Sequence, residues 1–324
     1  MVLILVSRLL QGAVIIFLVT SLTFLLVHLA PGDPFANVAE NTAASPELIA
    51  EQRRRAGLDR PLPAQYLTYV AGVARGNLGY SFSERRPVTH AIAERIPATI
   101  ALASAALLIN FALGIASGVL QGARPKSRID DALSAVSLTL YSIPVFWLGL
   151  LLVLVFGLGL GWLPVGGSQS AVGYEQLTFF GRAWDRATHL ILPALTLGLV
   201  GAAGTARYQR AAMQEVIQQS FIKTARAKGL GERIVLLRHG LRNALLPVIT
   251  LFGLSFPILL SGAVLVESVF AWPGLGRFAV EAIEARDYPV VTGAAIAAST
   301  MVVVGNLLAD VLYRIVDPRT RQEL

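Results

Sequence analysis

The sequence predicts an all-α polytopic membrane protein with six transmembrane helices. Apolar residues make up 55% of the 324 residues and charged residues only 15%, against about a quarter in soluble domains. The apolar residues fall in long blocks, and six of these blocks reach the roughly 20 residues that a helix needs to cross a bilayer. The surplus of Lys and Arg lies in polar segments between the blocks, as at the cytoplasmic face of membrane proteins.

The six blocks contain features that predict how their helices pack. The predicted spans are Leu9–Ala30, Ala98–Gly122, Ala132–Phe156, Leu190–Ala206, Ala244–Val266 and Val290–Tyr313. Gly114, Gly118 and Gly122 are four residues apart in the second block, which predicts a close approach to a neighbouring helix. Pro144 lies inside the third block, where its ring removes one backbone hydrogen bond and predicts a kink.

The first block has an alternative interpretation as a secretory signal peptide. Its apolar core is longer than the roughly 7–15 residues usual for a signal, and Pro31 follows the plausible small-residue cleavage site. We therefore favour a membrane span.

The charge distribution predicts that both termini face the cytoplasm. With the amino terminus inside, the cytoplasmic segments hold a clear excess of cations, whereas the opposite face is nearly neutral. The inside cations are Arg8, Arg124, Lys126, Arg128, Arg207, Arg210, Lys223, Arg226, Lys228, Arg233, Arg238, Arg242, Arg314, Arg319 and Arg321. In a membrane chain such a surplus marks orientation and predicts no nucleic-acid partner.

Most of the predicted outside face belongs to the polar segment 31–96. Turn and capping signals predict short helices that begin near Ser45, Pro63 and Pro87, the third leading into the second span at Pro97. The segment is too small and too polar for a core of its own. We therefore interpret residues 1–96 as the first helix plus an extracytoplasmic cap, and residues 97–324 as a five-helix core.

A second predicted outside segment covers residues 158–189. It begins with the repeated glycines Gly157, Gly159 and Gly161. A dinucleotide-binding loop is a poor interpretation because no strand precedes the glycines and Pro164 follows them. A tight helix exit is the better interpretation.

A basic segment, residues 207–247, interrupts the apolar blocks and predicts a docking element for another protein. A helical pattern breaks at Gly229-Leu230-Gly231, resumes from Glu232 and ends at Leu246-Pro247, where the next span begins. Its apolar face after the turn consists of Leu230, Ile234 and Leu237, with Arg233 at the rim. The alternative is a basic helix that lies on anionic lipid.

The absence of common catalytic motifs predicts that the chain is not an enzyme. The sequence contains no Gly-Lys pair and hence no Walker A phosphate loop, and neither His-Glu-x-x-His nor Gly-x-Ser-x-Gly occurs. It also lacks cysteine, and its four histidines are far apart, so we expect no catalytic residues, no metal site and no cofactor in this chain.

Polar and aromatic residues inside spans often face a pathway. The pathway-lining candidates are Tyr141, Ser142, Phe146, Ser255 and Ser261.

Short motifs along nearly the whole chain carry a family resemblance. They are Ala30–Pro34, Gly57–Leu62, Gln65-Tyr66, Gly76–Ser81, Gly161–Pro164, Thr224–Leu230, Leu237–His239, Arg242–Pro247, Val266-Glu267, Pro273–Arg277, Arg286–Pro289, Asn306–Asp310 and Asp317–Arg319. Because these motifs occur in this order and at this spacing, the chain resembles the permease subunits of dipeptide/oligopeptide-type, binding-protein-dependent ABC importers.

The resemblance implies a fold, a location and partners. It implies the type I ABC importer permease fold in a bacterial or archaeal cytoplasmic (inner) membrane. The partners would be a second homologous permease, two ATP-binding subunits (or two copies of one) that hold ATP and Mg, and an extracytoplasmic substrate-binding protein. Coupling to the ATPase is expected at Ala225, Gly229, Leu230, Gly231, Glu232, Arg233, Ile234 and Leu237.

The coupling segment departs from the general importer motif at one place. That motif opens Glu-Ala-Ala, whereas this chain has Lys223-Thr224-Ala225. An ionic contact from the motif's acid to the ATPase is therefore not expected here.

Other functions and cargoes stay open at the level of sequence. The alternative function is an ion-coupled secondary transporter, but neither an inverted repeat nor a mid-membrane acid supports it. A membrane enzyme would need a catalytic constellation. Within the family, the alternative cargoes to di- or oligopeptides are nickel complexes, glutathione and opines.

Overall fold

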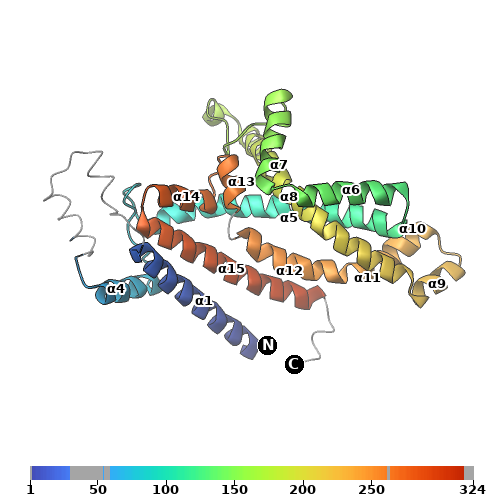
Figure 1. Cartoon of the computed structure of the whole chain (residues 1–324), viewed down its shortest axis with the longest axis horizontal. Coiled ribbons are helices and arrows are strands. Elements are labelled where there is room, and N and C mark those ends of the chain that lie inside the picture. The colour runs from blue at the N-terminus through green and yellow to red at the C-terminus, as the bar shows by residue number, and fades with distance from the viewer. Residues whose placement is uncertain (1, 30–53, 55–58, 261–262, 317–324) are drawn as a thin grey trace. The chain divides into compact units, whose positions relative to one another are not determined.

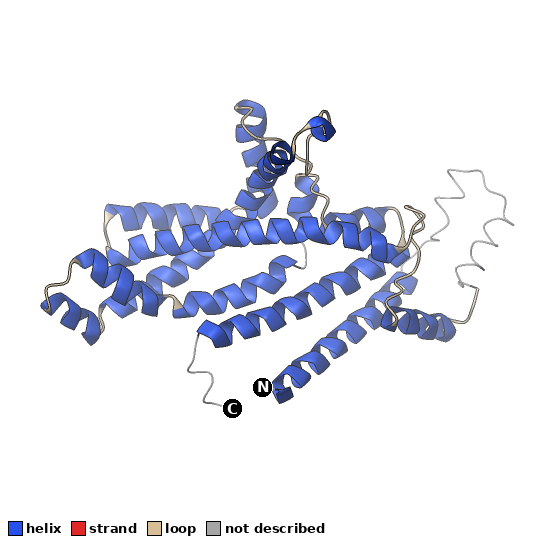
Figure 2. Cartoon of the chain, turned by 180° about the vertical axis from the view of Figure 1, so that it is seen from behind, coloured by secondary structure: helices blue, strands red, loops and turns tan. Residues whose placement is uncertain are grey.

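The computed structural model describes residues 2–29, 54, 59–260 and 263–316 (Figure 1). These residues are helices joined by loops (Figure 2), and within them the only strand-like pairing is an isolated bridge between Tyr80 and Pro87. The predicted all-α class is confirmed. The helices are α1 (Val2–Leu29), α4 (Leu62–Ala74), α5 (Val88–Ala123), α6 (Arg128–Ser142), α7 (Val145–Leu152), η1 (Val153–Gly159), η2 (Tyr174–Gln176), α8 (Phe179–Ile217), α9 (Ser220–Ala227), α10 (Glu232–Ile234), η3 (Val235–Leu241), α11 (Arg242–Ala244), α12 (Leu246–Leu260), α13 (Val264–Val269), α14 (Leu275–Glu284) and α15 (Tyr288–Val316).

Four of the described helices are long and apolar enough to cross a membrane. They are the segments Val6–Leu29, Val88–Ala123, Phe179–Ile217 and Tyr288–Val311. Two bent helix pairs raise the number to six if each pair is one span. The described residues therefore contain four to six candidate spans.

The chain divides into two compact units, which we describe separately. The first unit comprises residues 1–99 and 274–303, and the second comprises residues 100–273 and 304–324.

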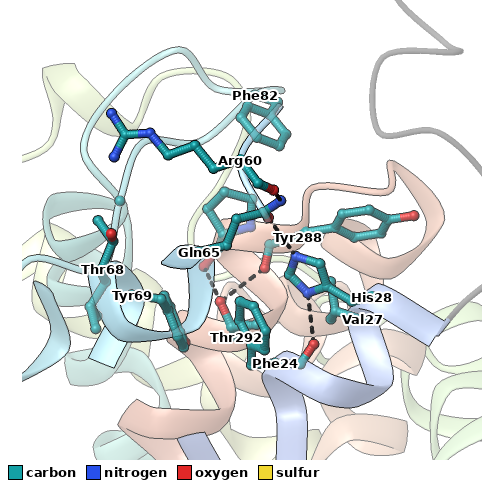
Figure 3. Close-up of a pocket in the computed structure, with 13 residues that line it drawn as sticks. Phe24, Val27, His28, Arg60, Gln65, Thr68, Tyr69, Phe82, Tyr288 and Thr292 are labelled. Atoms are coloured by element: carbon teal, nitrogen blue, oxygen red, sulfur yellow. Dashed lines mark hydrogen bonds between the residues drawn. The ribbon is translucent and has the colours of Figure 1, made fainter. Parts of the chain in front are cut away.

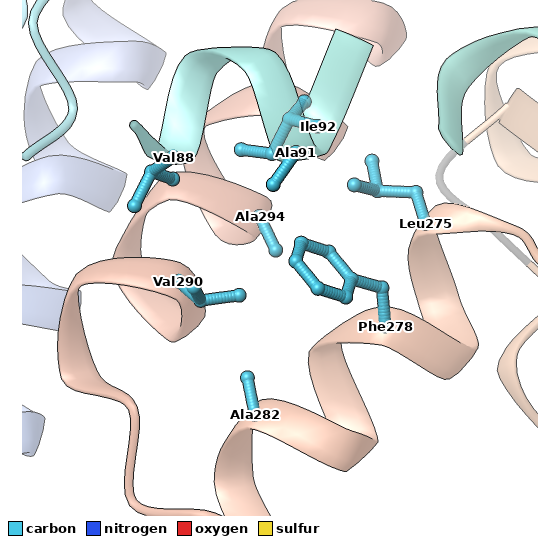
Figure 4. Close-up of a cluster of buried hydrophobic side chains, with 8 residues drawn as sticks. All are labelled: Val88, Ala91, Ile92, Leu275, Phe278, Ala282, Val290 and Ala294. Carbon is cyan, nitrogen blue, oxygen red and sulfur yellow. The ribbon is translucent and has the colours of Figure 1, made fainter. Parts of the chain in front are cut away.

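The core of the first unit lies where the start of α5 meets α14 and the start of α15. Figure 4 shows the side chains of Val88, Ile92, Leu275, Phe278 and Val290 converging there, and each is at most 5% exposed. These apolar residues recur at helical spacing on their own elements, so each helix presents one face to the others.

The third predicted outside helix, from Pro87 to Arg95, is not separate. It is the first part of α5, which runs without a break through Pro97. This helix leads directly into the second span, because a single lost backbone hydrogen bond at a proline is tolerated where packing supports the helix. Here Val88 and Ile92 pack on α14 and α15. The second predicted outside helix is confirmed as α4, and the first, near Ser45, lies outside the described residues.

A buried carboxylate fixes the loop before α5 to the start of α15. Asp287 is fully buried, and one of its oxygens accepts hydrogen bonds from the Ser81 hydroxyl (2.6 Å), the Ser83 hydroxyl (2.6 Å) and the Ser83 amide (2.9 Å). Three donors on one buried carboxylate oxygen satisfy a group that would otherwise be costly to bury. The loop 78–87 is thereby held in one conformation.

The second unit is built on a close seam between α5 and α8. A Cβ atom added to Gly114, Gly118 or Gly122 would lie 2.6 Å from an atom of α8. Such contacts are shorter than real Cβ contacts, so the glycines permit this helix separation. The Thr205 hydroxyl donates to Asn110 Oδ1 across the seam at 2.7 Å. The predicted close approach of the second span is confirmed.

Pro144 does more than kink the third predicted span. It separates α6 from α7, and the bent pair Arg128–Ser142 and Val145–Gly159 turns by 107°. Ile143 has an extended backbone with ψ 132°, as the residue before a proline prefers. The helix then leaves through a π-helical turn, and Gly161 has a φ of +63°, which agrees with the predicted tight exit.

Two predicted boundaries in the second unit were wrong. Helix α8 begins at Phe179, inside the segment expected to be an outside loop, because the Thr178 side chain accepts from the Gly181 amide (3.2 Å) and caps the helix early. The predicted fifth span is divided between α12 and a separate helix, α13.

Candidate functional site

The basic segment of the second unit folds as a helical hairpin, which we call the coupling hairpin (residues 220–244). Helix α8 ends at Ile217, and Gln219 adopts an extended backbone with ψ 151° before α9 begins. The chain turns at Gly229 and continues through α10, η3 and α11. The predicted helix, glycine turn and second helix are present, and the additional break at Gln219 carries no Gly or Pro signal in the sequence.

Gly229 makes the turn with a left-handed backbone, φ +78°. Its amide donates to the Arg226 carbonyl (2.9 Å), and the Leu230 amide donates to the Ala225 carbonyl (3.4 Å). A left-handed residue just after a helix is the common glycine termination, which satisfies the last carbonyls. Residues with a Cβ atom rarely adopt this conformation. The turn therefore requires glycine for its backbone rather than for space, since no atom lies within 4 Å of an added Cβ.

A small apolar core holds the two arms of the coupling hairpin together. Ile222 and Val235 are fully buried and Ala225 is 6% exposed, and Val216 packs beside them. Ala225, one of the expected coupling residues, thus lies inside the hairpin. A packed interior lets a short hairpin move as one body.

An ion pair closes the turn on its exposed side. Arg226 donates to both carboxylate oxygens of Glu232, at 2.6 Å from Nη2 and 3.1 Å from Nε. This contact raises the pKa of the Arg226 guanidinium above its ordinary value. The two side chains are 40% and 56% exposed, so solvent screens the pair and its contribution to stability is small. Its bidentate geometry mainly orients the second arm.

The expected docking face of the coupling hairpin is exposed. Leu230 is 38% exposed, and Ile234 and Leu237 are each 48% exposed. Ile234 and Leu237 are three residues apart in the second arm, which places them on one side of it, and Leu230 lies in the turn just before that arm. Gly231 and Arg233 are also exposed.

An ion pair between a buried carboxylate and a partly exposed guanidinium lies where α8 approaches the coupling hairpin, and it was not predicted from the sequence. Asp130 in α6 is 1% exposed, and Arg210 in α8 donates to its two oxygens at 2.7 and 2.8 Å. The Lys126 amide donates to the same carboxylate at 2.9 Å. Removal of the Arg210 guanidinium would leave the buried Asp130 carboxylate uncompensated, which is strongly destabilising. The pair therefore fixes α6 against α8.

Three of the pathway-lining candidates flank the Pro144 break. Tyr141 is 57% exposed, with the Arg207 guanidinium 5.5 Å from its ring centre. The Ser142 hydroxyl donates to the Leu138 carbonyl of its own helix (2.8 Å), and Phe146 is 43% exposed at the start of α7. Ser255 is half-buried on α12, and Ser261 lies outside the described residues.

The described part of the chain holds no group of three His, Cys, Asp or Glu residues arranged to bind a metal ion.

Comparisons with known proteins identify the class. The family profile described as "Binding-protein-dependent transport system inner membrane component" matches residues 111–322, and the corresponding profile for the N-terminal part matches residues 1–103. The chain belongs to this family and is an inner-membrane protein. It is a permease subunit of an ABC importer.

Several curated relatives match over nearly the full length. The chain is 42% identical over 319 residues, 95% of each chain, to the di/tripeptide transport system permease protein DppB of Pseudomonas aeruginosa. It is 41% identical to the oligopeptide transport system permease protein AppB of Bacillus subtilis, covering 97% of this chain and 98% of that protein. It is 40% identical to the glutathione transport system permease protein GsiC of Escherichia coli K12, covering 98% of both chains.

Proposed function

We propose that this chain forms half of a translocation pathway for di- or oligopeptides, with a second, related permease forming the other half. One of two ATPase subunits docks at the coupling hairpin, the two ATPase subunits bind the ATP and Mg, and an extracytoplasmic binding protein delivers the cargo. The observation that carries this proposal is the packed hairpin with its left-handed Gly229 and exposed apolar face. The names of the relatives support peptides as cargo.

The coupling mechanism follows from the hairpin's construction. Closure of the ATPase dimer on ATP moves its surface clefts, and a hairpin with its own core transmits that motion as a rigid body. Leu230, Ile234 and Leu237 supply the apolar contact, and Gly229 and Glu232 set the angle of the second arm. Arg233 lies at the rim, where its charge contributes to steering more than to affinity.

We propose six spans with both termini in the cytoplasm, in which each bent pair of helices counts as one span. Residues 1–96 would then be the first span and its extracytoplasmic cap, and residues 97–324 the five-helix core. The basic coupling hairpin on the inside agrees with the excess of Lys and Arg in inside segments.

Cysteine labelling tests this orientation, and the natural absence of cysteine makes the test clean. We expect a cysteine at the exposed Asn77 to react with an impermeant thiol reagent in intact cells. A cysteine at the exposed Gln218, just before the coupling hairpin, should react only after the membrane is opened. Labelling of Gln218→Cys from outside would overturn the proposed topology.

A substitution on the docking face tests the ATPase contact. Leu230→Asp places a charge at the centre of the proposed interface, where buried apolar contacts carry most of the binding energy. We expect at least a tenfold loss of co-purifying ATPase, since each roughly 1.4 kcal/mol changes binding tenfold. Arg233→Ala, at the rim, is the matched control and should weaken retention only modestly. Unchanged co-purification with Leu230→Asp would show that the docking surface lies elsewhere.

Ligand binding by the cognate binding protein tests the cargo. We expect that protein to bind di- or oligopeptides and to ignore nickel complexes and opines. Selective binding of glutathione or a metal complex would assign a different cargo to the same importer.

A further inference from the structure

A half-enclosed pocket lies in the first unit. It has a volume of about 190 Å³ and lies among the last turn of α1, the first turns of α4, the loop at 78–82 and the start of α15. Its apolar wall includes Phe24, Val27, Leu78 and Pro289. Figure 3 shows Arg60 and Phe82 at the end of the pocket opposite Phe24 and Val27. The Arg60 side chain therefore lies at the end of the pocket away from Phe24 and Val27.

The end of the pocket at Arg60 carries positive charge. Among the described residues, Arg60 has no acidic partner for its guanidinium. His28 Nδ1 lies 2.8 Å from the Phe24 carbonyl and Nε2 lies 3.1 Å from Gln65 Oε1. The His28 ring also stacks on Phe24, with ring centroids 3.9 Å apart. An anion at the Arg60 end would therefore meet the guanidinium of Arg60.

A phenol adds a neutral donor to the wall. Burial raises the pKa of the Tyr69 phenol, so the group stays protonated at neutral pH. Tyr69 and Phe24 are also stacked, with ring centroids 5.6 Å apart. A hydroxyl set beside an aromatic wall suits the boundary between a polar head and an apolar tail.

The length of α1 places this pocket at the membrane surface. The helix has 28 residues, which at about 1.5 Å per residue gives a length of roughly 42 Å, against about 30 Å for the hydrocarbon core. Its last turn, with Phe24 and His28, therefore reaches the headgroup layer. Aromatic residues concentrate at this depth in membrane proteins, and Tyr66 also packs against Phe24.

We propose that this pocket binds one anionic glycerophospholipid. The phosphate would lie at Arg60, and the first carbons of one acyl chain would pack against Phe24, Val27 and Leu78. Tyr69 would donate to an ester oxygen. The separation of the Arg60 charge from the wall at Phe24 and Val27 matches a charged head and an apolar tail, and the depth of the pocket matches the position of a lipid in its own leaflet.

The test uses the complete, delipidated transporter and two synthetic lipids. Native mass spectrometry counts bound dioleoyl-phosphatidylglycerol and dioleoyl-phosphatidylcholine as each is added back. We expect one phosphatidylglycerol site per chain that is preferred over phosphatidylcholine. Arg60→Gln should weaken it about tenfold, as expected for loss of a charge-assisted hydrogen bond. Tyr69→Phe keeps the wall and should weaken it less.

Arg75→Gln is the matched control because Arg75 follows α4, is exposed and does not line the pocket. It should leave phosphatidylglycerol binding unchanged. Equal binding of the two lipids, or equal loss in Arg60→Gln and Arg75→Gln, would overturn the proposal. Displacement of the lipid by sn-glycerol 3-phosphate would also overturn it and assign the site to a soluble phosphate ester.

Discussion

Gly229→Val should abolish most of the transport-linked ATP hydrolysis of the assembled importer while leaving the protein inserted. Gly229 has a φ of +78°, a conformation that costs residues with a Cβ atom about 1–3 kcal/mol and β-branched residues the most. The valine hairpin will relieve this strain by changing the angle between α9 and the second arm. A shift of about 2 kcal/mol depopulates the docked geometry more than tenfold. The measurement is binding-protein-stimulated ATP hydrolysis in proteoliposomes.

The neighbouring glycine provides a matched control. Gly231 has an ordinary extended backbone, φ −61° and ψ 141°, and an added Cβ meets no atom within 4 Å. Gly231→Val should therefore retain most of the activity. Gly229→Asn should be intermediate, because asparagine tolerates the left-handed region better than other residues. If Gly229→Val showed the same binding-protein-stimulated ATP hydrolysis as the wild type, the turn at Gly229 would not be needed for coupling.

Gly118→Ala should destabilise the second unit by overpacking the seam between α5 and α8. The new Cβ atom would lie 2.6 Å from the Ala206 carbonyl oxygen and 2.6 Å from Gln209 Cβ. The first of these is backbone, so α5 and α8 must separate. We expect a loss of several degrees in the thermal midpoint of the detergent-solubilised complex, because overpacking costs about 1–3 kcal/mol.

Gly204→Ala is the control for this substitution. Gly204 lies within α8, and an added Cβ meets no atom within 4 Å. Alanine is favoured over glycine in a helix by about 1 kcal/mol, so this variant should be as stable as the parent or more stable. If both variants shift the midpoint equally, the close seam does not determine stability.

Features that depend on one residue's backbone were predictable from the sequence. The turn at Gly229 and the break at Pro144 follow from the conformations that glycine and proline allow. The glycine seam was predictable because its spacing puts Gly114, Gly118 and Gly122 on one face of a helix.

Features that depend on distant packing were not predictable. The sequence identifies Arg210 only as a cytoplasmic cation, because its partner Asp130 is 80 residues away along the chain and meets it only when α6 lies beside α8. The continuity of α5 through Pro97 likewise depends on α14 and α15. The proposed lipid pocket joins four separate segments of the first unit, and none of them carries a recognisable lipid-binding motif.

The Asp130–Arg210 pair also has a mechanical consequence. Two parallel hydrogen bonds resist both sliding and rotation, so the amino-terminal end of α6 is fixed to α8 in one orientation. From Asp130, α6 continues for a further 12 residues to Ser142, about 18 Å at 1.5 Å per residue, and ends at the Pro144 break. Arg207 of α8 lies 5.5 Å from the Tyr141 ring near that far end, so α8 holds α6 at both ends and a tilt of α8 carries Tyr141 with it.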